Sequence, residues 1–248
     1  MSGARPLPQC HMVDPLLRKL SNFAPLSSEE QQAVADACTD IRPVGAREDV
    51  IAQGQPNAGV HVLLEGFACG YKVLENGRRQ IVSYFVPGDL CGLRVLILGR
   101  IDHSIGGIAP SKFAVIAPQA VQEMTDRYPQ LTRALCWSTL VEEAILREWI
   151  VSVGQRTALE RMGHLFCELF FRFRAVRMHY GTSCAMPLTQ LELGETLGLS
   201  AMHVNRSLQE LRRQHLITLE GGVLTIPDLD GLARLSLFNP DYLHLNSV

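Results

Sequence analysis

The stretch from Thr189 to Leu211 constrains the fold of this chain more than any other. It reads TQLELGETLGLSAMHVNRSLQEL, in which Thr189 can cap a short helix that ends near Leu197 and Ser200 can cap a second helix after Gly198. The apolar residues that would lock the two helices at a steep angle are Leu193, Leu197, Leu199, Val204, Leu208 and Leu211. A short helix, a turn that contains Gly and a second helix form the helix-turn-helix pattern.

The second helix is predicted to carry its small and polar residues early, at the end that meets the bases of DNA. In a helix-turn-helix protein the first turns of this helix enter the major groove. The candidate DNA-contacting residues are Thr189, Ser200, Ala201, Met202, His203, Asn205, Arg206 and Gln209. Arg206 is the expected base reader, because bidentate Arg to guanine is the commonest specific contact. A helical packing module is the alternative, since a helix pair with a Gly turn is common in helical proteins.

The segment LITLEGGVLTI follows the second helix and predicts two short strands joined at Gly221-Gly222. Such a hairpin is the wing of a winged helix. The capped turn, the wing and the basic residues Arg206, Arg212 and Arg213 together favour DNA binding over a packing module. Arg212 and Arg213 are expected to meet phosphates or solvent.

Composition limits how the chain can bind DNA and in which cellular compartment it is expected. Its formal net charge is −2 over 248 residues, so any nucleic-acid contact must come from a local patch. No apolar run is long enough to span a bilayer, and the first residues do not resemble a secretory signal. The seven Cys residues are scattered without a C-x-x-C pair. These features predict a cytoplasmic protein without a disulfide framework, a metal or another cofactor.

The N-terminal half is rich in short β-strand patterns. Over 42–116, apolar runs alternate with turn signals at a spacing of about ten residues, which is typical of a small antiparallel barrel or sandwich. Asn76-Gly77 predicts a tight hairpin turn in which both residues take positive φ. Short helices are expected on either side of this region, over 27–38 and 118–128.

A long helix is predicted over 129–153, where Pro129 suits the first turn and no Gly breaks the chain before Gly154. Residues that alternate by four and three along this helix, apolar except at Ser138 and Glu142, predict the seam of a two-helix dimer. The seam residues are Leu131, Leu135, Ser138, Glu142, Ile145 and Trp149. The alternative is a helix packed on its own domain.

Three segments carry a resemblance that covers nearly the whole chain. GRRQIVSYFVPGDLCGL is similar to the barrel hairpin of the Crp/Fnr transcription regulators, QRTALERMGHL to the start of their DNA-binding domain, and LTQLELGETLGLSAMHVNRSLQELRRQHLI to their helix-turn-helix. The resemblance implies an α+β fold with an N-terminal antiparallel β-roll (a double-stranded β-helix), a long dimerisation helix and a C-terminal winged helix-turn-helix. It implies a homodimer, not an enzyme, that binds a two-fold symmetric site on double-stranded DNA, with RNA polymerase as a further partner. The expected domains are 1–128 for the cyclic-nucleotide-binding-like sensor, 129–153 for the dimerisation helix and 154–248 for the DNA-binding domain.

The residues that hold a cyclic nucleotide in that family are replaced here. Nucleotide-binding members carry a Gly-Glu pair and then an Arg-Ser pair, where this chain has Gly92-Leu93 and His103-Ser104. A neutral His lacks the planar fork that Arg offers to phosphate, so cyclic AMP is not the expected effector. The family's Thr-Ser ligand pair falls near Leu146-Arg147, which leaves a different ligand or no ligand. The candidate effector-pocket residues are Gly92, Leu93, Arg94, His103, Ser104 and Arg147.

Two further departures concern the sensor and the DNA target. Oxygen sensors of the family hold an iron–sulfur centre with an N-terminal Cys cluster, whereas only Cys10 lies in that region of this chain. Many members place Glu where Met202 stands. The DNA sequence that the protein recognises is therefore expected to differ from theirs.

Two alternative functions remain. The first is a cupin-like metal enzyme, for which His61 and Glu65 share one strand face, although no second His completes the ligand set. The second is a cyclic-nucleotide-responsive signalling module whose C-terminal domain binds a protein. The missing Glu and Arg argue against its ligand, and the complete helix-turn-helix argues against its class of partner.

Overall fold

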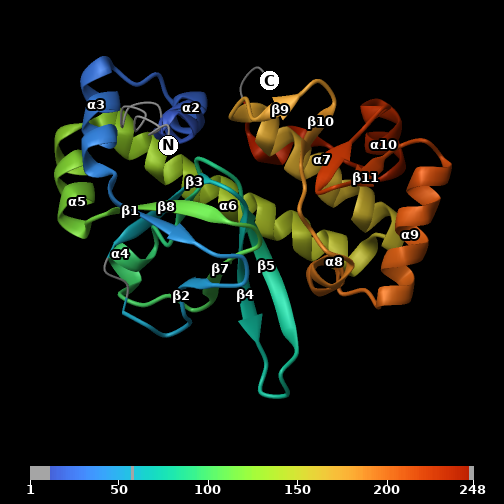
Figure 1. The fold of residues 1–248 in the computed structure, drawn as a ribbon. Helices are drawn as coiled ribbons and strands as arrows, with labels where there is room; N and C mark the ends of the chain where they lie inside the picture. Colours follow the sequence, from blue (N-terminus) through green and yellow to red (C-terminus); the bar gives the residue numbers. More distant parts are fainter. Residues whose placement is uncertain (1–11, 57–58, 246–248) are drawn as a thin grey trace, which may run out of the picture.

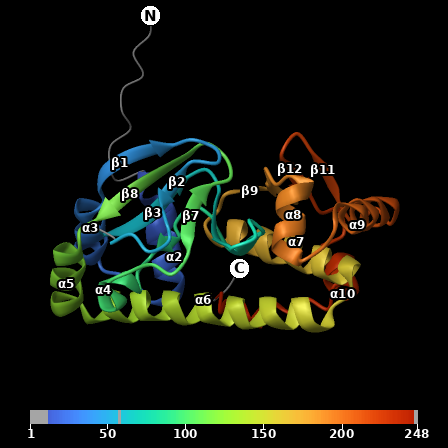
Figure 2. The same cartoon turned by 90° about the horizontal axis from the view of Figure 1, so that it is seen from below.

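The computed structural model describes residues 12–56 and 59–245, and the long helix α6 connects two parts of the molecule (Figure 1). Figure 2 shows the β-rich N-terminal part over one half of α6 and the C-terminal helices over the other. The N-terminal elements are α2 (Asp14–Phe23), α3 (Ser28–Ala37), β1 (Thr39–Val44), β2 (Asp49–Ile51), β3 (Val60–Glu65), β4 (Ala68–Val73), β5 (Arg79–Phe85), β6 (Leu90–Cys91), α4 (Val95–Leu98), β7 (Ser104–Gly107), β8 (Ser111–Ile116) and α5 (Pro118–Arg127). The elements that follow are α6 (Pro129–Gln155), α7 (Ala158–Ala175), β9 (His179–Tyr180), β10 (Ser183–Ala185), α8 (Gln190–Leu197), α9 (Ala201–Arg213), β11 (Thr218–Glu220), β12 (Val223–Thr225), α10 (Leu229–Leu235) and the 3-10 helix η1 (Pro240–Leu243).

The strands of the N-terminal part form two four-stranded sheets, with the orders β1-β8-β3-β6 and β2-β7-β4-β5. Every strand pair in them is antiparallel. Leu63, Ile105 and Phe113 are fully buried in one core that both sheets share. The predicted antiparallel β-roll is therefore confirmed, and so are the short helices expected before and after it.

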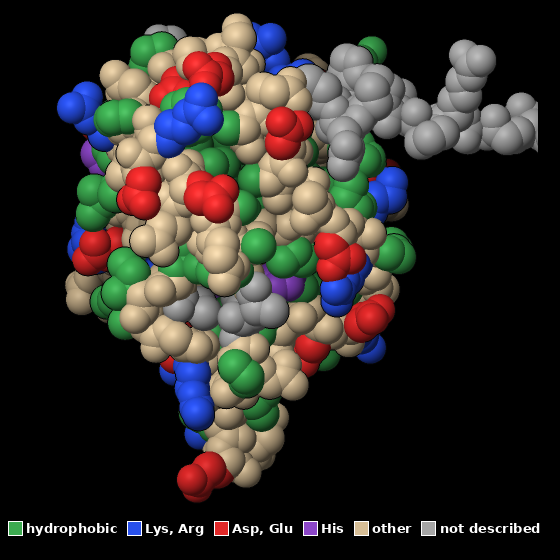
Figure 3. Space-filling model, turned by 90° about the vertical axis from the view of Figure 1, so that its left-hand side faces the viewer, with side chains coloured by type: hydrophobic (Ala, Val, Ile, Leu, Met, Phe, Trp, Pro, Cys, Tyr) green, Lys and Arg blue, Asp and Glu red, His purple; other side chains and the backbone are tan. Residues whose placement is uncertain are grey.

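The hairpin between β4 and β5 differs from the predicted tight turn. The Leu74 N–H donates to the Arg78 carbonyl at 2.9 Å, which leaves residues 75–77 in the loop. Gly77 takes a φ of +80°, whereas Asn76 does not take positive φ. The prediction for Asn76 is wrong, because a three-residue hairpin loop needs only one left-handed residue. The hairpin projects from the rest of the molecule in Figures 1 and 3.

Helix α6 has 27 residues and is about 40 Å long. It continues through Gly154, so the break predicted there is wrong. The helix ends where Arg156 adopts extended backbone and Thr157 begins the next helix. Thr157 and Glu160 form a reciprocal capping box at the start of α7, and this cap, rather than the Gly, sets the boundary.

The face of α6 that was predicted to be the dimer seam packs on the protomer's own core. Leu131, Leu135 and Ile145 are buried. Trp149 is half-buried, and its Nε1 donates to the carboxylate of Glu168 on α7 at 3.0 Å. A two-helix seam and a core-facing stripe both place apolar residues three and four apart, so periodicity alone does not distinguish them. For this face, packing on its own protomer is the correct interpretation.

The C-terminal part is built around α7, which is buried on nearly all sides and contacts α9 and α10. A four-stranded sheet in the order β11-β12-β10-β9 flanks these helices. The 3-10 helix η1 docks on the two long helices, since the Tyr242 hydroxyl donates to Glu168 of α7 at 2.9 Å and η1 also contacts α6. Within the described residues, no helix combines the length and apolar character needed to cross a bilayer.

Candidate functional site

Hydrogen-bonded caps fix α8 and α9 at the predicted positions. The Thr189 N–H donates to the Glu192 carboxylate at 2.8 Å, and the Glu192 N–H donates to Thr189 Oγ1 at 3.2 Å. Gly198 ends α8 with a φ of +65°, a conformation that strains any residue with a Cβ. Ser200 caps α9 by accepting a hydrogen bond from the His203 N–H at 3.4 Å. The predicted helix-turn-helix is confirmed.

One side of α9 is buried and the other is open to solvent. Val204, Leu208 and Leu211 are buried, and α9 contacts α7 and α8. The predicted DNA-contacting residues are all exposed, namely Thr189, Ser200, Ala201, Met202, His203, Asn205, Arg206 and Gln209. Met202 is a large apolar side chain that is 63% exposed. The first turns of α9 therefore present an open face to which another molecule can bind.

The arginines of α9 differ in whether their guanidinium groups already have partners. Arg213 pairs with Glu210 at 2.6 Å, and its hydrogen bonds are the largest cause of the lowered pKa of Glu210, about 2. Arg212 donates to the Leu219 carbonyl at 3.1 Å and so joins α9 to β11. Arg206 has no hydrogen bond or ion pair within the part of the chain that the structure describes. Its donors are therefore available to a ligand.

The hairpin that follows α9 is the predicted wing. Strands β11 and β12 pair with Glu220 opposite Val223. Gly221 and Gly222 lie between them with φ values of +57° and +76°. Two consecutive residues with positive φ make the tight turn of a two-residue hairpin. The wing lies directly after α9 in the chain and is fastened to it by Arg212.

A cavity of about 340 Å³ lies between β5, the segment 92–103 and α6. Four of the predicted effector-pocket residues line it, namely Gly92, Leu93, Arg94 and His103. The exposed atoms of the wall are mainly apolar, with Val82 of β5 and Val141 and Ile145 of α6 among them, although charged residues line it too. The sequence therefore located one side of this cavity correctly.

The structure places the other two predicted residues elsewhere. Ser104 Oγ accepts a hydrogen bond from the Gln53 N–H at 3.0 Å and is not part of the wall. Arg147 is exposed on α6 and pairs with Glu143 at 3.0 Å. The guanidinium of Arg147 thus lies outside the cavity, because the residue falls on the outer face of the helix.

Two polar residues of the apolar stripe on α6, Ser138 and Glu142, line the cavity instead. Ser138 is 1% exposed and its hydroxyl has no hydrogen-bond partner. Burial raises the pKa of Glu142. Their polarity was the signal that could have marked this part of the helix as the wall of a cavity rather than a packed seam.

Several charged groups around the cavity are already paired with one another, whereas Arg100, which also lines it, has no ion pair among the described residues. Asp102 Oδ1 lies 2.9 Å from His103 Nδ1, and this hydrogen bond is the largest cause of the lowered pKa of Asp102. Lys72 lies 3.5 Å from the same carboxylate. Arg94 lies 3.5 Å from the carboxylate of Glu142. A ligand that needs one of these cations must compete with a carboxylate.

Asp89 of the Pro-Gly-Asp turn lies at the inner end of the cavity. It is 2.5 Å from Lys19 of α2 and 2.6 Å from Arg172 of α7, and it accepts a hydrogen bond from the Val86 N–H at 2.8 Å. Burial alone would raise the pKa of Asp89, but the two cations and the hydrogen bonds outweigh it and the pKa is lowered. No local sequence pattern marks Lys19 and Arg172, because they meet Asp89 only in the folded chain.

Comparisons with known proteins agree with this geometry. A cyclic nucleotide-binding domain model matches residues 41–128, and a Crp-like helix-turn-helix domain model matches residues 160–235. The transcriptional activator protein Anr of Pseudomonas aeruginosa is 25% identical over 232 residues, which is 94% of this chain and 95% of Anr. FnrL of Cereibacter sphaeroides, also a transcriptional activator, is 27% identical over 197 residues, 77% of this chain and 78% of FnrL. The structure of FixK2 from Bradyrhizobium japonicum superposes with a TM-score of 0.71 at 23% identity, over 79% of this chain and 96% of FixK2.

The chain belongs to the Crp/Fnr family. Its C-terminal part is a helix-turn-helix DNA-binding domain, its N-terminal part is a sensor domain, and the protein is a transcription regulator. Leu93 and His103 thus replace the Glu and Arg of nucleotide-binding members within the same type of sensor domain. The cavity that these residues line is the place to look for an effector.

The face of the sensor domain drawn in Figure 3 does not form a second DNA-binding surface. Basic and acidic side chains are interspersed there rather than gathered into a basic patch. Binding to the duplex backbone depends on cations that neutralise phosphates. The helix-turn-helix is therefore the surface to consider for DNA.

The residues of the cupin-like alternative do not form a metal site. Glu65 pairs with Lys112 at 2.8 Å, and burial is the largest cause of the lowered pKa of His61. No group of three or more His, Cys, Asp or Glu side chains in the described ranges could hold a metal ion. Cys10 lies outside the described residues.

Proposed function

We propose that this regulator is a homodimer that reads a two-fold symmetric DNA site with the first turns of α9 from each protomer. The observation that carries the proposal is the open face of α9. Met202, Asn205 and Arg206 are exposed there, and the guanidinium of Arg206 has no partner among the described residues. An exposed Arg early in this helix can make the bidentate contact with guanine that gives helix-turn-helix proteins much of their specificity.

The dimer forms through the outer face of α6 rather than through the face first predicted. Exposed residues recur along that face at spacings of four and three, in the order Cys136, Leu140, Glu143, Arg147 and Ile150. Leu140 is 56% exposed and Ile150 is 72% exposed. Two large apolar side chains on this face, with the Glu143–Arg147 ion pair between them, suit a parallel two-helix seam about the dimer axis.

The sensor cavity does not take cyclic AMP. Leu93 offers no carboxylate to a ribose hydroxyl, and the imidazole of His103 already lies against Asp102. Lys72 and Arg94 are held by Asp102 and Glu142, so a cyclic phosphate would have to displace a carboxylate to reach either of these two cations. The mainly apolar wall supports a different, largely apolar effector. A sensor without a ligand, whose DNA binding follows protein abundance alone, is the other outcome.

A regulator of transcription acts where the chromosome is, which supports the cytoplasmic location expected from the sequence. RNA polymerase is the proposed partner for regulation, because the relatives Anr and FnrL are named as transcriptional activators. The proposal includes no catalytic step.

A mobility-shift assay on genomic DNA fragments tests the DNA-reading role. The wild type should shift a subset of fragments, and Arg206→Ala should weaken binding by about 1–3 kcal/mol and relax preference at one base position in each half-site. Arg213→Ala is the matched control, since it removes the same charge from the same helix at a residue already paired with Glu210. An equal loss of affinity for every fragment in both variants would show that Arg206 contributes charge only and does not read bases.

A further inference from the structure

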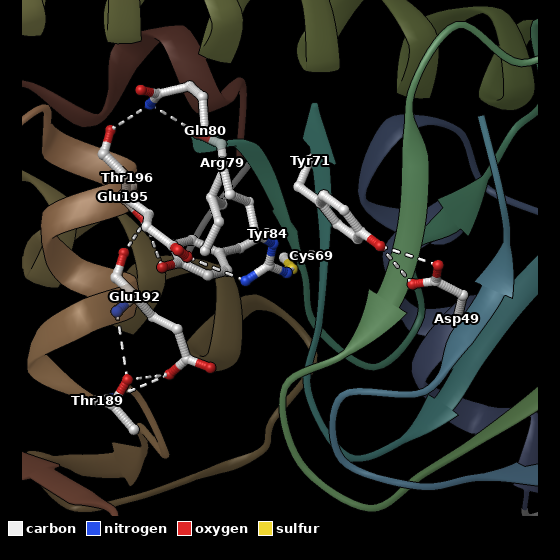
Figure 4. Close-up of polar contacts among 11 residues, drawn as sticks. Asp49, Cys69, Tyr71, Arg79, Gln80, Tyr84, Thr189, Glu192, Glu195 and Thr196 are labelled. Atoms are coloured by element: carbon white, nitrogen blue, oxygen red, sulfur yellow. Dashed lines mark hydrogen bonds and ion pairs between the residues drawn. The ribbon is translucent and has the colours of Figure 1, made fainter. Parts of the chain in front are cut away.

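Strand β5 is joined to α8 by polar contacts that cross from the sensor domain to the DNA-binding domain (Figure 4). Arg79 Nη1 pairs with the Glu195 carboxylate at 3.0 Å, and Gln80 Nε2 donates to the Thr196 carbonyl at 3.1 Å. The Tyr84 hydroxyl lies 2.5 Å from Thr196 Oγ1. These three contacts are called the β5–α8 clasp.

Tyr84 is held by the DNA-binding domain at both its side chain and its backbone. Thr196 Oγ1 donates its single hydrogen to the Glu192 carbonyl at 2.7 Å, so the Tyr84 hydroxyl must donate to Thr196. Arg172 of α7 donates to the Tyr84 carbonyl at 2.7 Å. Tyr84 is only 1% exposed, so water competes poorly for either contact.

The strand that forms the clasp is also a wall of the sensor cavity. Residues 82–85 of β5 line the cavity, and so does Arg172. On its other side the clasp holds α8, which leads through the left-handed Gly198 into α9. A molecule in the cavity therefore touches the same strand that positions the helix-turn-helix.

We propose that Tyr84 is a positioning residue that couples the sensor cavity to the helix-turn-helix, and that the closed clasp holds α9 in the orientation that meets DNA. The proposal rests on the DNA-binding function proposed above. The exposed face of α9 is open while the clasp is closed, so the closed conformation is compatible with DNA. A dimer must hold its two α9 helices about 34 Å apart, so displacement of α8 lowers affinity. An occupant of the cavity acts by binding the closed and open conformations unequally.

Cys69 reports whether the clasp is open. It lies opposite Tyr84 in the pairing of β4 with β5, it is fully buried, and its Sγ is 3.2 Å from Arg79 Nη2. Burial raises the pKa of Cys69 to about 12, so the thiol is unreactive while the clasp is closed. Cys91 is also fully buried but lies in the core between the two sheets of the sensor domain. Cys91 therefore reports unfolding of the sensor domain.

The test is alkylation of the full-length protein by iodoacetamide, with the rates at Cys69 and Cys91 followed by peptide mass spectrometry. Tyr84→Phe removes only a hydroxyl, and Glu195→Gln removes only a charge. Each should raise the Cys69 rate by about three- to tenfold, the effect of one hydrogen bond on the opening equilibrium, and leave the Cys91 rate unchanged. Tyr128→Phe is the matched control, because it removes a hydroxyl that is bonded to Glu29, away from the clasp, and should leave both rates unchanged.

Equal acceleration at Cys69 and Cys91, or no acceleration at Cys69, would overturn the clasp. Ser138→Leu tests the coupling, since it fills part of the cavity and loses no hydrogen bond. It should change the Cys69 rate by about threefold or more, and an unchanged rate would overturn the coupling.

Adding a genomic fragment that the wild type shifts should slow alkylation of Cys69, and acceleration would overturn the link between the closed clasp and DNA binding. The variants are compared without DNA. A wild type that shifts no fragment would therefore contradict the proposed function alone, and the alkylation rates would still decide whether the clasp exists.

Discussion

Placing Asp at both Leu140 and Ile150 should convert the protein to monomers. These side chains are 56% and 72% exposed on the outer face of α6. Full burial of a Leu or Ile side chain contributes about 1.5–3 kcal/mol, so covering the exposed parts of both residues on both protomers contributes about 4–8 kcal/mol. The double variant loses this contribution and also sets like charges against each other across the seam. Its dimer dissociation constant should rise by at least about a thousandfold.

Light scattering coupled to size exclusion measures the result directly, and circular dichroism checks that the protomer stays folded. The control is Tyr180→Asp with Leu237→Asp, which adds the same charge at exposed apolar sites outside α6. We expect the control to remain a dimer and to bind DNA. The outer face of α6 is not the seam if the Leu140 and Ile150 variant still sizes as a dimer at micromolar concentration. Leu135→Asp with Ile145→Asp would test the stability of the protomer rather than the dimer, because both residues are buried within the protomer.

Three further outcomes are expected. Isothermal calorimetry at pH 6 and pH 8 should detect no low-micromolar binding of cyclic AMP or cyclic GMP, and such binding with a matching gain in DNA affinity would contradict the assignment of the cavity. Gly198→Ala should lower stability by about 1–2 kcal/mol because it forces a Cβ into the left-handed region, and an unchanged melting temperature by scanning calorimetry would count against this. Asp89→Asn should destabilise the fold by about 3 kcal/mol at pH 7 in urea titrations, because it leaves the largely buried Lys19 without its carboxylate and Arg172 with that of Glu168 alone. Because the pKa of Asp89 is lowered in the folded protein, its stabilisation of the fold is present above the unfolded pKa of about 4 and is lost as the pH falls further. The unfolding free energies of wild type and variant should therefore converge in acid. A difference between them that stays constant with pH would refute this linkage.

Local signals predicted the DNA-binding domain well. Thr189, Gly198 and Ser200 fix α8 and α9 through caps and one left-handed residue, and such interactions depend on neighbours within about four positions. Gly221-Gly222 marked the wing for the same reason. These elements could be predicted because their stabilising contacts are short-range in sequence.

Contacts between distant parts of the chain could not be predicted. The apolar stripe through Leu135 and Ile145 predicts a dimer seam wrongly, because periodicity gives the spacing of a face but not what covers it. Asp89 meets cations from α2 and α7, and Tyr84 meets Thr196 of α8, through separations of many tens of residues. Arg147 fell outside the cavity because its position on the turn of α6 depends on which face packs inward. The contacts around the sensor cavity could therefore be found only from the structure.

Selection of bound sequences from a random pool of double-stranded DNA tests the central claim most directly. A dimer that reads bases with α9 from each protomer should enrich an inverted repeat whose half-site centres lie about 10–10.5 base pairs, or a multiple of that spacing, apart. Enrichment of no motif, or of a single motif without an inverted partner, would contradict the account.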